Sequence, residues 1–388
     1  MRFKKTIGKI HLVLGLGSGI IIVILGITGC ILAFETEIRT VTDREQFVQP
    51  EEKPYVLPSL LKVNAEKVLP NKKIVGIDYP GRDKAALAYS YDSTSYFLVA
   101  LNPYDGKVIS FKDMNRDFFR VVLDLHYYLW LPPKIGQPIV GYSTLIFLIM
   151  LISGLILWWP RNKAAKKQRF SIKWNARWRR VNYDLHNVLG FYMTWVAIFI
   201  AITGLVMGLN WFASSFYWAT SGGKALIPHE HPVSDRAYAG LVDKDLGNKL
   251  WNRHLQQAKP GESVSIYYPA DQTDPLEVVL NHRPGTYYDV EAFHYDQYSG
   301  KEIFPKGDDN GTFAEASFGD KIKRMNYDIH VGAILGLPGK IMAFFASLIA
   351  ASLPVTGFYV WWGRRKKKKT SLTFFYKKSK TKKLALSE

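Results

Sequence analysis

The sequence predicts an α-helical membrane protein: a four-span bundle from a tandem duplication, with two extracytoplasmic α+β domains. Four apolar stretches are each long enough to cross a bilayer, which takes about 20 residues of helix. Basic residues gather beside these stretches, and a pattern of histidines repeats in the second half of the chain. Apolar length predicts the spans, charge predicts their orientation, and the repeat predicts the duplication.

The apolar stretches lie at about 10–34, 138–160, 186–213 and 338–362. The first follows Arg2, Lys4 and Lys5, as the apolar core of a signal peptide would. Its apolar run is longer than such a core, and its His11-Leu-Val-Leu-Gly15 resembles His186-Asn-Val-Leu-Gly190 of the third stretch. We therefore expect the first stretch to be retained as a true span.

The formal net charge of +18 is concentrated in three segments. Residues 1–9 hold 4 Lys and Arg, residues 161–180 hold 9 and residues 364–383 hold 11, with no Asp or Glu among them. The positive-inside rule places these segments in the cytoplasm. Both termini are then cytoplasmic, in a multi-pass membrane protein that contacts lipid. Because each basic block adjoins a span, we exclude nucleic acid as the partner.

This topology divides the chain into eight parts. They are transmembrane helix 1 (10–34), a first extracytoplasmic domain (35–115), a His-bearing segment with transmembrane helix 2 (116–160), a basic cytoplasmic loop (161–180), transmembrane helix 3 (181–213), a second extracytoplasmic domain (214–317), a His-bearing segment with transmembrane helix 4 (318–362), and a basic cytoplasmic tail (363–388). Each extracytoplasmic domain shows a helical pattern, at 57–69 or 245–258, followed by short alternating strands. The strands are expected at 74–79, 85–91, 96–102, 263–268, 276–281 and 287–295.

Four histidines each precede an apolar run that contains a Thr-Gly or Ser-Gly pair. The pairs are His11 with Thr28-Gly29, His126 with Ser153-Gly154, His186 with Thr203-Gly204, and His330 with Thr356-Gly357, at spacings of 17, 27, 17 and 26 residues. Ionisable residues near membrane depth are usually functional. Charge placement puts His11 and His186 near the cytoplasmic surface and His126 and His330 on the outer side. The single cysteine, Cys30, excludes disulfides, cysteine-ligated clusters and covalently attached haem.

The two extracytoplasmic regions end in similar turns, Tyr104-Asp105-Gly106-Lys107 and Tyr298-Ser299-Gly300-Lys301. A helix, a small antiparallel sheet and such a closing turn resemble the PepSY domain. Together with four histidine-bearing spans, residues 1–366 resemble the PepSY-associated transmembrane helix family of bacteria. Members of that family include inner-membrane ferric-siderophore reductases that hold two b-type haems. The resemblance therefore implies two haem b, electron transfer and iron acquisition.

Imidazole is a common axial ligand of haem iron. Two copies with the same topology are related by an axis along the membrane normal, so equivalent histidines can approach one iron from opposite sides. We predict that His11 and His186 hold one haem iron, and that His126 and His330 hold the other. A zinc or copper site is the competing interpretation, but its ligands would gather in one place.

The spacing of other residues predicts supporting roles for them. Gly15 and Gly190 follow their histidines by four residues, on the same helix face, and would let a flat macrocycle lie against the backbone; close helix packing is the alternative. Cations precede each histidine by six or seven residues and could pair with haem propionates. On the inner side the positive-inside rule also explains them, so the better candidates are Arg116, Arg120, Lys323 and Arg324. A loop with His229-Glu230-His231 could contact iron.

The first functional hypothesis is a transmembrane electron conduit, an oxidoreductase without acid–base catalytic residues. It would reduce an extracytoplasmic ferric siderophore, or another oxidant. Because no flavin or nicotinamide motif is present, the electron donor is an unknown cytoplasmic protein or a quinol. The alternative is a non-enzymatic membrane regulator or assembly factor that binds peptide or protein through its PepSY-like domains.

Overall fold

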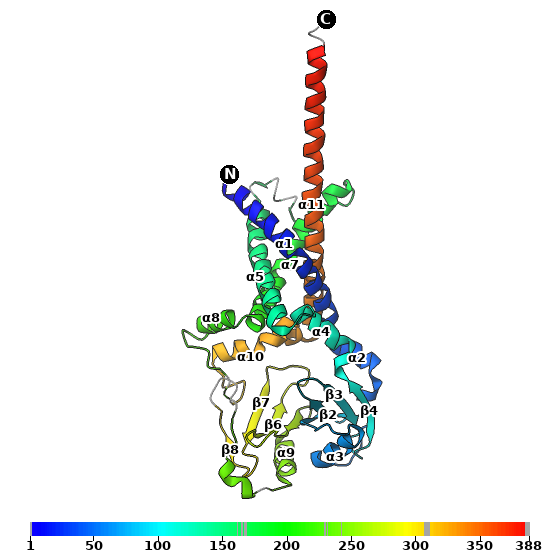
Figure 1. The fold of residues 1–388 in the computed structure, drawn as a ribbon, viewed down its shortest axis with the longest axis vertical. Helices are drawn as coiled ribbons and strands as arrows, with labels where there is room; N and C mark the ends of the chain where they lie inside the picture. Colours follow the sequence, from blue (N-terminus) through cyan, green and yellow to red (C-terminus); the bar gives the residue numbers. More distant parts are fainter. Residues whose placement is uncertain are drawn as a thin grey trace. The chain divides into compact units, whose positions relative to one another are not determined.

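Four long apolar helices dominate the computed structural model, which describes residues 2–160, 162–163, 166, 169–228, 230, 232–241, 243–305 and 311–384 (Figure 1). The helices that could cross a membrane are α1 (Arg2–Ala33), α5 (Pro133–Trp158), α7 (Trp178–Gly208) and the first part of α11 (Gly336–Leu384). Each coincides with a predicted span, so the chain is a membrane protein with four apolar helices. The basic residues before the first span continue α1, which therefore begins earlier than the hydropathy indicates.

Shorter helices connect the spans to the strands. They are α2 (Glu35–Thr42), α3 (Pro58–Val68), α4 (Phe118–Tyr128), α8 (Asn210–Thr220), α9 (Leu246–Gln257) and α10 (Phe318–His330), with one-turn or two-turn helices η1 (Arg44–Gln46), η2 (Met114–Arg116), η3 (Arg236–Leu241) and η4 (Ala333–Leu335). The predicted third span ran to residue 213, but Leu209 has extended backbone and separates α7 from α8. Positive φ angles at Leu129 and Trp130 likewise separate α4 from α5. His126 therefore lies on α4, separate from the span α5. His330 likewise ends α10, which is separate from α11.

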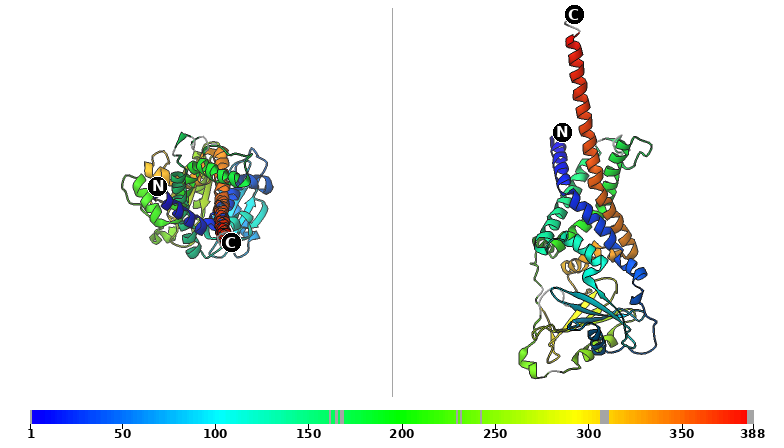
Figure 2. Two further views of the ribbon diagram at one scale, coloured as in Figure 1. Left: turned by 90° about the horizontal axis from the view of Figure 1, so that it is seen from above. Right: turned by 45° about the vertical axis from the view of Figure 1, so that its right-hand side comes forward.

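The chain forms two compact units. The first comprises Met1–Ile31, Leu125–Gly208 and Ile341–Glu388, and contains the membrane helices. The second comprises Leu32–Asp124 and Leu209–Lys340, and contains all the described strands. Within the first unit, the start of α1 and the far end of α11 lie at the same end of the bundle in both side views (Figures 1 and 2).

The second unit is built on one eight-stranded antiparallel sheet. Its strands are β1 (Gly76–Tyr79), β2 (Ala86–Tyr91), β3 (Tyr96–Leu101), β4 (Val108–Asp113), β5 (Ser263–Tyr267), β6 (Leu276–Asn281), β7 (Val290–Tyr295) and β8 (Glu302–Ile303), in the order β4-β3-β2-β1-β5-β6-β7-β8. The two polar regions contribute four strands each. They join where β1 pairs with β5, with Ile77 opposite Ile266. The sequence indicated two separate domains, and the structure shows that their strands form one continuous sheet.

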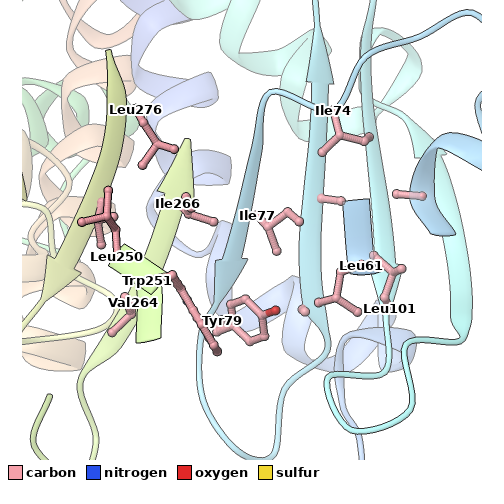
Figure 3. Packing of buried hydrophobic residues seen from close by; sticks show 14 of the residues in the cluster. Leu61, Ile74, Ile77, Tyr79, Leu101, Leu250, Trp251, Val264, Ile266 and Leu276 are labelled. Carbon is pink, nitrogen blue, oxygen red and sulfur yellow. The ribbon is translucent and has the colours of Figure 1, made fainter. Parts of the chain in front are cut away.

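One face of this sheet carries the hydrophobic core, and α3 and α9 cover it. The alternating burial along β2, β5 and β6 follows from strand geometry, in which successive side chains point to opposite faces. Leu61 of α3 and Trp251 of α9 are 0% and 1% exposed and pack among strand residues such as Ile77 and Ile266 (Figure 3). The opposite face is more polar: the phenol groups of Tyr89 and Tyr267 both donate to Asp78, at 2.5 and 3.1 Å.

Candidate functional site

The imidazoles of His11 and His186 are each held through Nδ1 by a hydroxyl group on another membrane helix. Nδ1 of His11, on α1, lies 2.8 Å from Oγ of Ser153 on α5. Nδ1 of His186, on α7, lies 2.9 Å from Oγ1 of Thr356 on α11. Because a metal-binding histidine usually engages its second ring nitrogen in a hydrogen bond, this arrangement suits Nε2 as a ligand atom.

His126 is held in the same way. Its Nδ1 lies 2.8 Å from Oγ1 of Thr28 on α1. His330 ends α10 and belongs to the second unit, whereas His126 belongs to the first. That these two histidines share one iron stays a prediction from the sequence pattern.

His11 and His186 line the same cavity of the first unit, which has a volume of about 670 Å³. Pockets for cofactors and other small molecules usually measure roughly 300–1,000 Å³. Helices α1, α5, α7 and α11 supply the wall, largely with apolar side chains such as Leu12, Phe147 and Phe191. The cavity thus presents two imidazoles to a single bulky, mainly apolar ligand.

Gly15 and Gly190 also line this cavity. A Cβ atom at Gly15 would lie 2.7 Å from Cε of Met150, and one at Gly190 would lie 3.6 Å from Cδ2 of Leu353. The absence of a side chain at Gly15 therefore allows Met150 of α5 to approach, as the packing interpretation expects. Their position in the wall is also compatible with the predicted macrocycle contact, so both interpretations stand.

Five cations surround the cavity, and no acidic residue is found among its described lining residues. The cations are Lys4, Lys5, Lys9, Arg169 and Arg364. Two of them are oriented by neighbours, since Lys4 Nζ donates to the carbonyl of Trp159 at 3.0 Å and Arg169 donates to Oδ1 of Asn187 at 3.2 Å. Such a rim suits an anionic ligand, because Lys and Arg form strong charge-assisted hydrogen bonds with carboxylates.

The sequence-predicted outer cations Arg116 and Arg120 lie in the second unit near its first four strands. The Arg116 side chain is 89% exposed, and its Nε lies 3.6 Å from Asp113. The Arg120 guanidinium lies over the ring of Tyr96, 5.9 Å from its centroid. A propionate contact by either residue stays a prediction.

Arg324 and Lys323 are neighbours on α10. The Arg324 guanidinium donates to the carbonyl oxygens of Tyr288 and Gly311, each at 3.2 Å, and to that of Val290. It therefore connects α10 to the start of β7 and to Gly311, which follows β8 in the sequence. This backbone role was not expected from the sequence, and it occupies several of the five donors that a guanidinium offers.

Asp184 and Asp328, each two residues before a histidine, accept hydrogen bonds from backbone N–H groups of other segments. Asp184 accepts from the backbone N–H of Lys173 at 3.3 Å and from Arg180 at 2.9 Å. Asp328, which is 0% exposed, accepts from the backbone N–H of Tyr287 at 2.9 Å. Burial raises the pKa of the Asp328 carboxyl, and this effect outweighs the backbone hydrogen bonds that lower it.

Histidines of the sheet region have structural partners. His282 contacts Glu262 through Nδ1 at 2.8 Å and Glu291 through Nε2 at 3.3 Å. Burial lowers its pKa, but the bonds to the two carboxylates outweigh burial and raise it above the usual value. Nε2 of the buried His254 lies 2.8 Å from the phenol oxygen of Tyr295, and burial lowers the pKa of this imidazole.

Among the described residues, no three His, Cys, Asp or Glu side chains lie close enough to hold one metal ion. His229 and His231 lie outside the described residues, so their predicted iron contact stays a prediction.

Sequence reasoning missed several residues of the cavity. Ser153 and Thr356 were noted as part of a repeated pattern but were not assigned to the histidines. The recurrence of Ser/Thr-Gly after each histidine was the signal that could have identified them. Lys9, Arg169 and Arg364 were also missed, because their positions depend on how distant helix ends pack together.

Comparison with known proteins gives the family. A family model described as "PepSY-associated TM region" matches residues 9–364, which is nearly the whole chain. A search of curated proteins finds no match. The four apolar helices and this match agree, and the chain belongs to the PepSY-associated TM region family.

Proposed function

We propose that this protein is a haem-binding oxidoreductase of the bacterial inner membrane that carries electrons across the bilayer to an extracytoplasmic acceptor. The acceptor class that we favour is Fe(III) bound by a siderophore. Reduction of Fe(III) to Fe(II) weakens the binding of the iron by the siderophore. The family match supports a membrane protein; haem, electron transfer and the acceptor are our inference.

One observation carries the proposal: His11 and His186 line one cavity and both use Nδ1 for a hydroxyl contact. The Nε2 atoms of His11 and His186, which line this cavity together, would hold the iron of a b-type haem. The largely apolar wall suits its macrocycle, and the cationic rim suits its propionates. These residues therefore fit the group.

When bound, haem supplies a one-electron Fe(III)/Fe(II) couple. The chain's own residues have three tasks in this proposal. His11 and His186 ligate, the apolar residues of α1, α5, α7 and α11 exclude water, and Lys4, Lys5, Lys9, Arg169 and Arg364 hold the propionates. His126 and His330 would hold a second haem b.

The proposed location follows from the charge distribution. The three basic segments favour a cytoplasmic position for both termini, and the start of α1 and the far end of α11 lie at one end of the bundle (Figure 2), which supports this orientation. The mirrored strand order on either side of the β1–β5 pair supports a tandem duplication with two PepSY-like halves.

Absorption spectroscopy tests this proposal. The full chain, purified in detergent from haem-replete cells, should show a Soret band that shifts on dithionite reduction. A pyridine haemochrome assay should give two haem b per chain. Protein that folds but shows no Soret band would overturn the proposal and favour the alternative, a regulator or assembly factor.

Proteoliposomes test the direction and the acceptor. Vesicles that enclose a reductant and carry the protein should reduce an external ferric siderophore, followed as Fe(II) captured by a chelator. Vesicles with the His186→Ala variant are the control and should be inactive. Equal rates in both would show that the acceptor is not reduced through this site.

A further inference from the structure

Each hydroxyl that contacts a histidine also has an acceptor on its own helix. Oγ1 of Thr28 donates to the carbonyl of Ile24 at 2.7 Å, and Oγ1 of Thr356 donates to that of Ser352 at 3.0 Å. Oγ of Ser153 donates to the carbonyl of Met150 at 3.2 Å. Such back-bonding to the preceding turn is common for Ser and Thr within helices.

Counting protons then indicates which ring nitrogen carries the proton of the contact. A hydroxyl has one proton and two acceptor lone pairs. When the hydroxyl donates its proton to the helix carbonyl, as the oxygen–oxygen distances allow, its oxygen can only accept from the nearby imidazole. The proton of the contact must therefore be on Nδ1, and in a neutral ring Nε2 then keeps a lone pair.

The glycine of each pair lies beside the same ring. A Cβ atom at Gly357, which follows Thr356, would lie 3.1 Å from Cε1 of His186. Equivalent atoms at Gly154 and Gly29 would lie 3.6 Å from Cε1 of His11 and 3.7 Å from Cε1 of His126, respectively. The Ser/Thr thus holds Nδ1, and the glycine leaves room for the ring to reach it.

We propose that Ser153, Thr28 and Thr356 are positioning residues that lock His11, His126 and His186 in the Nδ1–H tautomer with Nε2 available as a ligand. This inference deepens the proposed function. It rests on that function for one point, which is that haem iron is the partner of Nε2. The positioning role also explains why the repeated pattern combines each histidine with a Ser-Gly or Thr-Gly pair. Thr203, the fourth hydroxyl of the pattern, donates to the carbonyl of Phe199 at 2.8 Å and so shares this local geometry.

The tautomer can be measured without any haem. The full-length chain, produced under haem limitation with ¹⁵N-labelled histidine, should give nitrogen resonances of Nδ1–H imidazoles for His11, His126 and His186. Thr356→Val should remove the His186 signature, whereas Thr356→Ser should retain it. Nε2–H tautomers at these rings would overturn the proposal, whether or not the protein binds haem.

The loaded protein provides a second readout. Thr356→Val should weaken haem binding by about 10–100-fold, the usual cost of losing a hydrogen bond to a metal ligand, and should shift the Fe(III)/Fe(II) equilibrium toward Fe(II). The shift is expected because Nδ1–H donation makes the imidazole a stronger donor to Fe(III). Thr356→Ser, which keeps the hydroxyl, should restore both the haem affinity and the Fe(III)/Fe(II) equilibrium. If the side chain only filled space, the hydroxyl would not be needed for this recovery.

Further variants distinguish failure of the positioning role from failure of the proposed haem binding. Ser153→Ala should change the same haem signal as Thr356→Val, because His11 and His186 share a cavity, and Thr28→Val should change the other. Thr144→Val is the matched control, since Thr144 donates to the carbonyl of Val140 at 2.9 Å on α5 and is not among the cavity's lining residues. A normal Soret band with unchanged affinity and potential in Thr356→Val would refute the positioning role while leaving haem binding intact.

Discussion

His11 and His186 of the membrane helices differ from His282 of the sheet region in the kind of partner that holds the imidazole. His11 and His186 contact hydroxyl groups through one nitrogen, Nδ1. His282 has carboxylates at both nitrogens, and the buried His254 packs against Phe293 with a ring separation of 4.2 Å. A neutral hydroxyl keeps an imidazole uncharged and ready to bind a metal, whereas paired carboxylates favour the protonated cation.

This difference predicts that the role of each histidine follows from the partner of its second ring nitrogen. Both sets are partly or fully buried, so burial alone does not distinguish them. The following substitutions test the contrast, beginning with the largest expected effect.

His11→Ala and His186→Ala should each abolish the same haem signal, because each removes one of two imidazoles in the shared cavity. Reduced-minus-oxidised spectra and haem stoichiometry would measure this. His282→Gln is the matched control in the sheet region and should leave the spectrum unchanged. If the two alanine variants affected different haems, the predicted pairing would be wrong.

His254→Ala should lower the stability of the protein and leave the haem spectrum unchanged. Removing the buried ring leaves Tyr295 without its partner and opens space beside Phe293, which should cost about 1–3 kcal/mol of stability. Thermal unfolding of the detergent-solubilised chain would report a lower midpoint. The haem spectrum of folded protein should remain that of the parent; a missing haem would mean that the two histidine sets are not distinct.

Gly357→Ala should disturb His186 without changing its chemical partners. The added methyl group would lie 3.1 Å from the ring, closer than ordinary contact, so the ring must shift at a cost of about 1–3 kcal/mol. Haem affinity should fall. Gly154→Ala, at 3.6 Å, should have a smaller effect, and Gly17→Ala, with nothing within 4 Å, should have none. An affinity order that does not follow these distances would contradict the account.

The smallest effect concerns pH. The pKa of His282 is raised by its carboxylate partners and that of Glu262 is lowered by His282, each against an opposing effect of burial. The pair's stabilisation is therefore lost as pH rises through the folded-state pKa of His282, above 6.5, and as pH falls through that of Glu262, below 4.5.

His282→Gln should remove at most about 1 kcal/mol, because the pair is partly exposed. Unfolding midpoints of the parent and variant, compared across pH, should differ between these limits and converge outside them. A difference that persisted at high pH would show that the ion pair is not its source.

The helices and strands were largely predictable from the sequence. Apolar runs of sufficient length identified the four spans, a helical pattern identified α3 and α9, and alternation identified most strands, because these signals are local. Boundaries were less predictable: the short β8 has little pattern of its own, and the break at Leu209 lies within an apolar run.

What the sequence by itself determined is the set of parts: four spans, their flanking charges, four histidines and their recurring Ser/Thr-Gly pairs. Only the tertiary structure decided that β1 pairs with β5 to make one sheet. It also decided that the hydroxyl of Ser153 contacts His11 and that of Thr356 contacts His186. The reason is physical. Helix and strand formation depends on neighbours along the chain, whereas these contacts join residues 142 and 170 positions apart and depend on how whole helices pack.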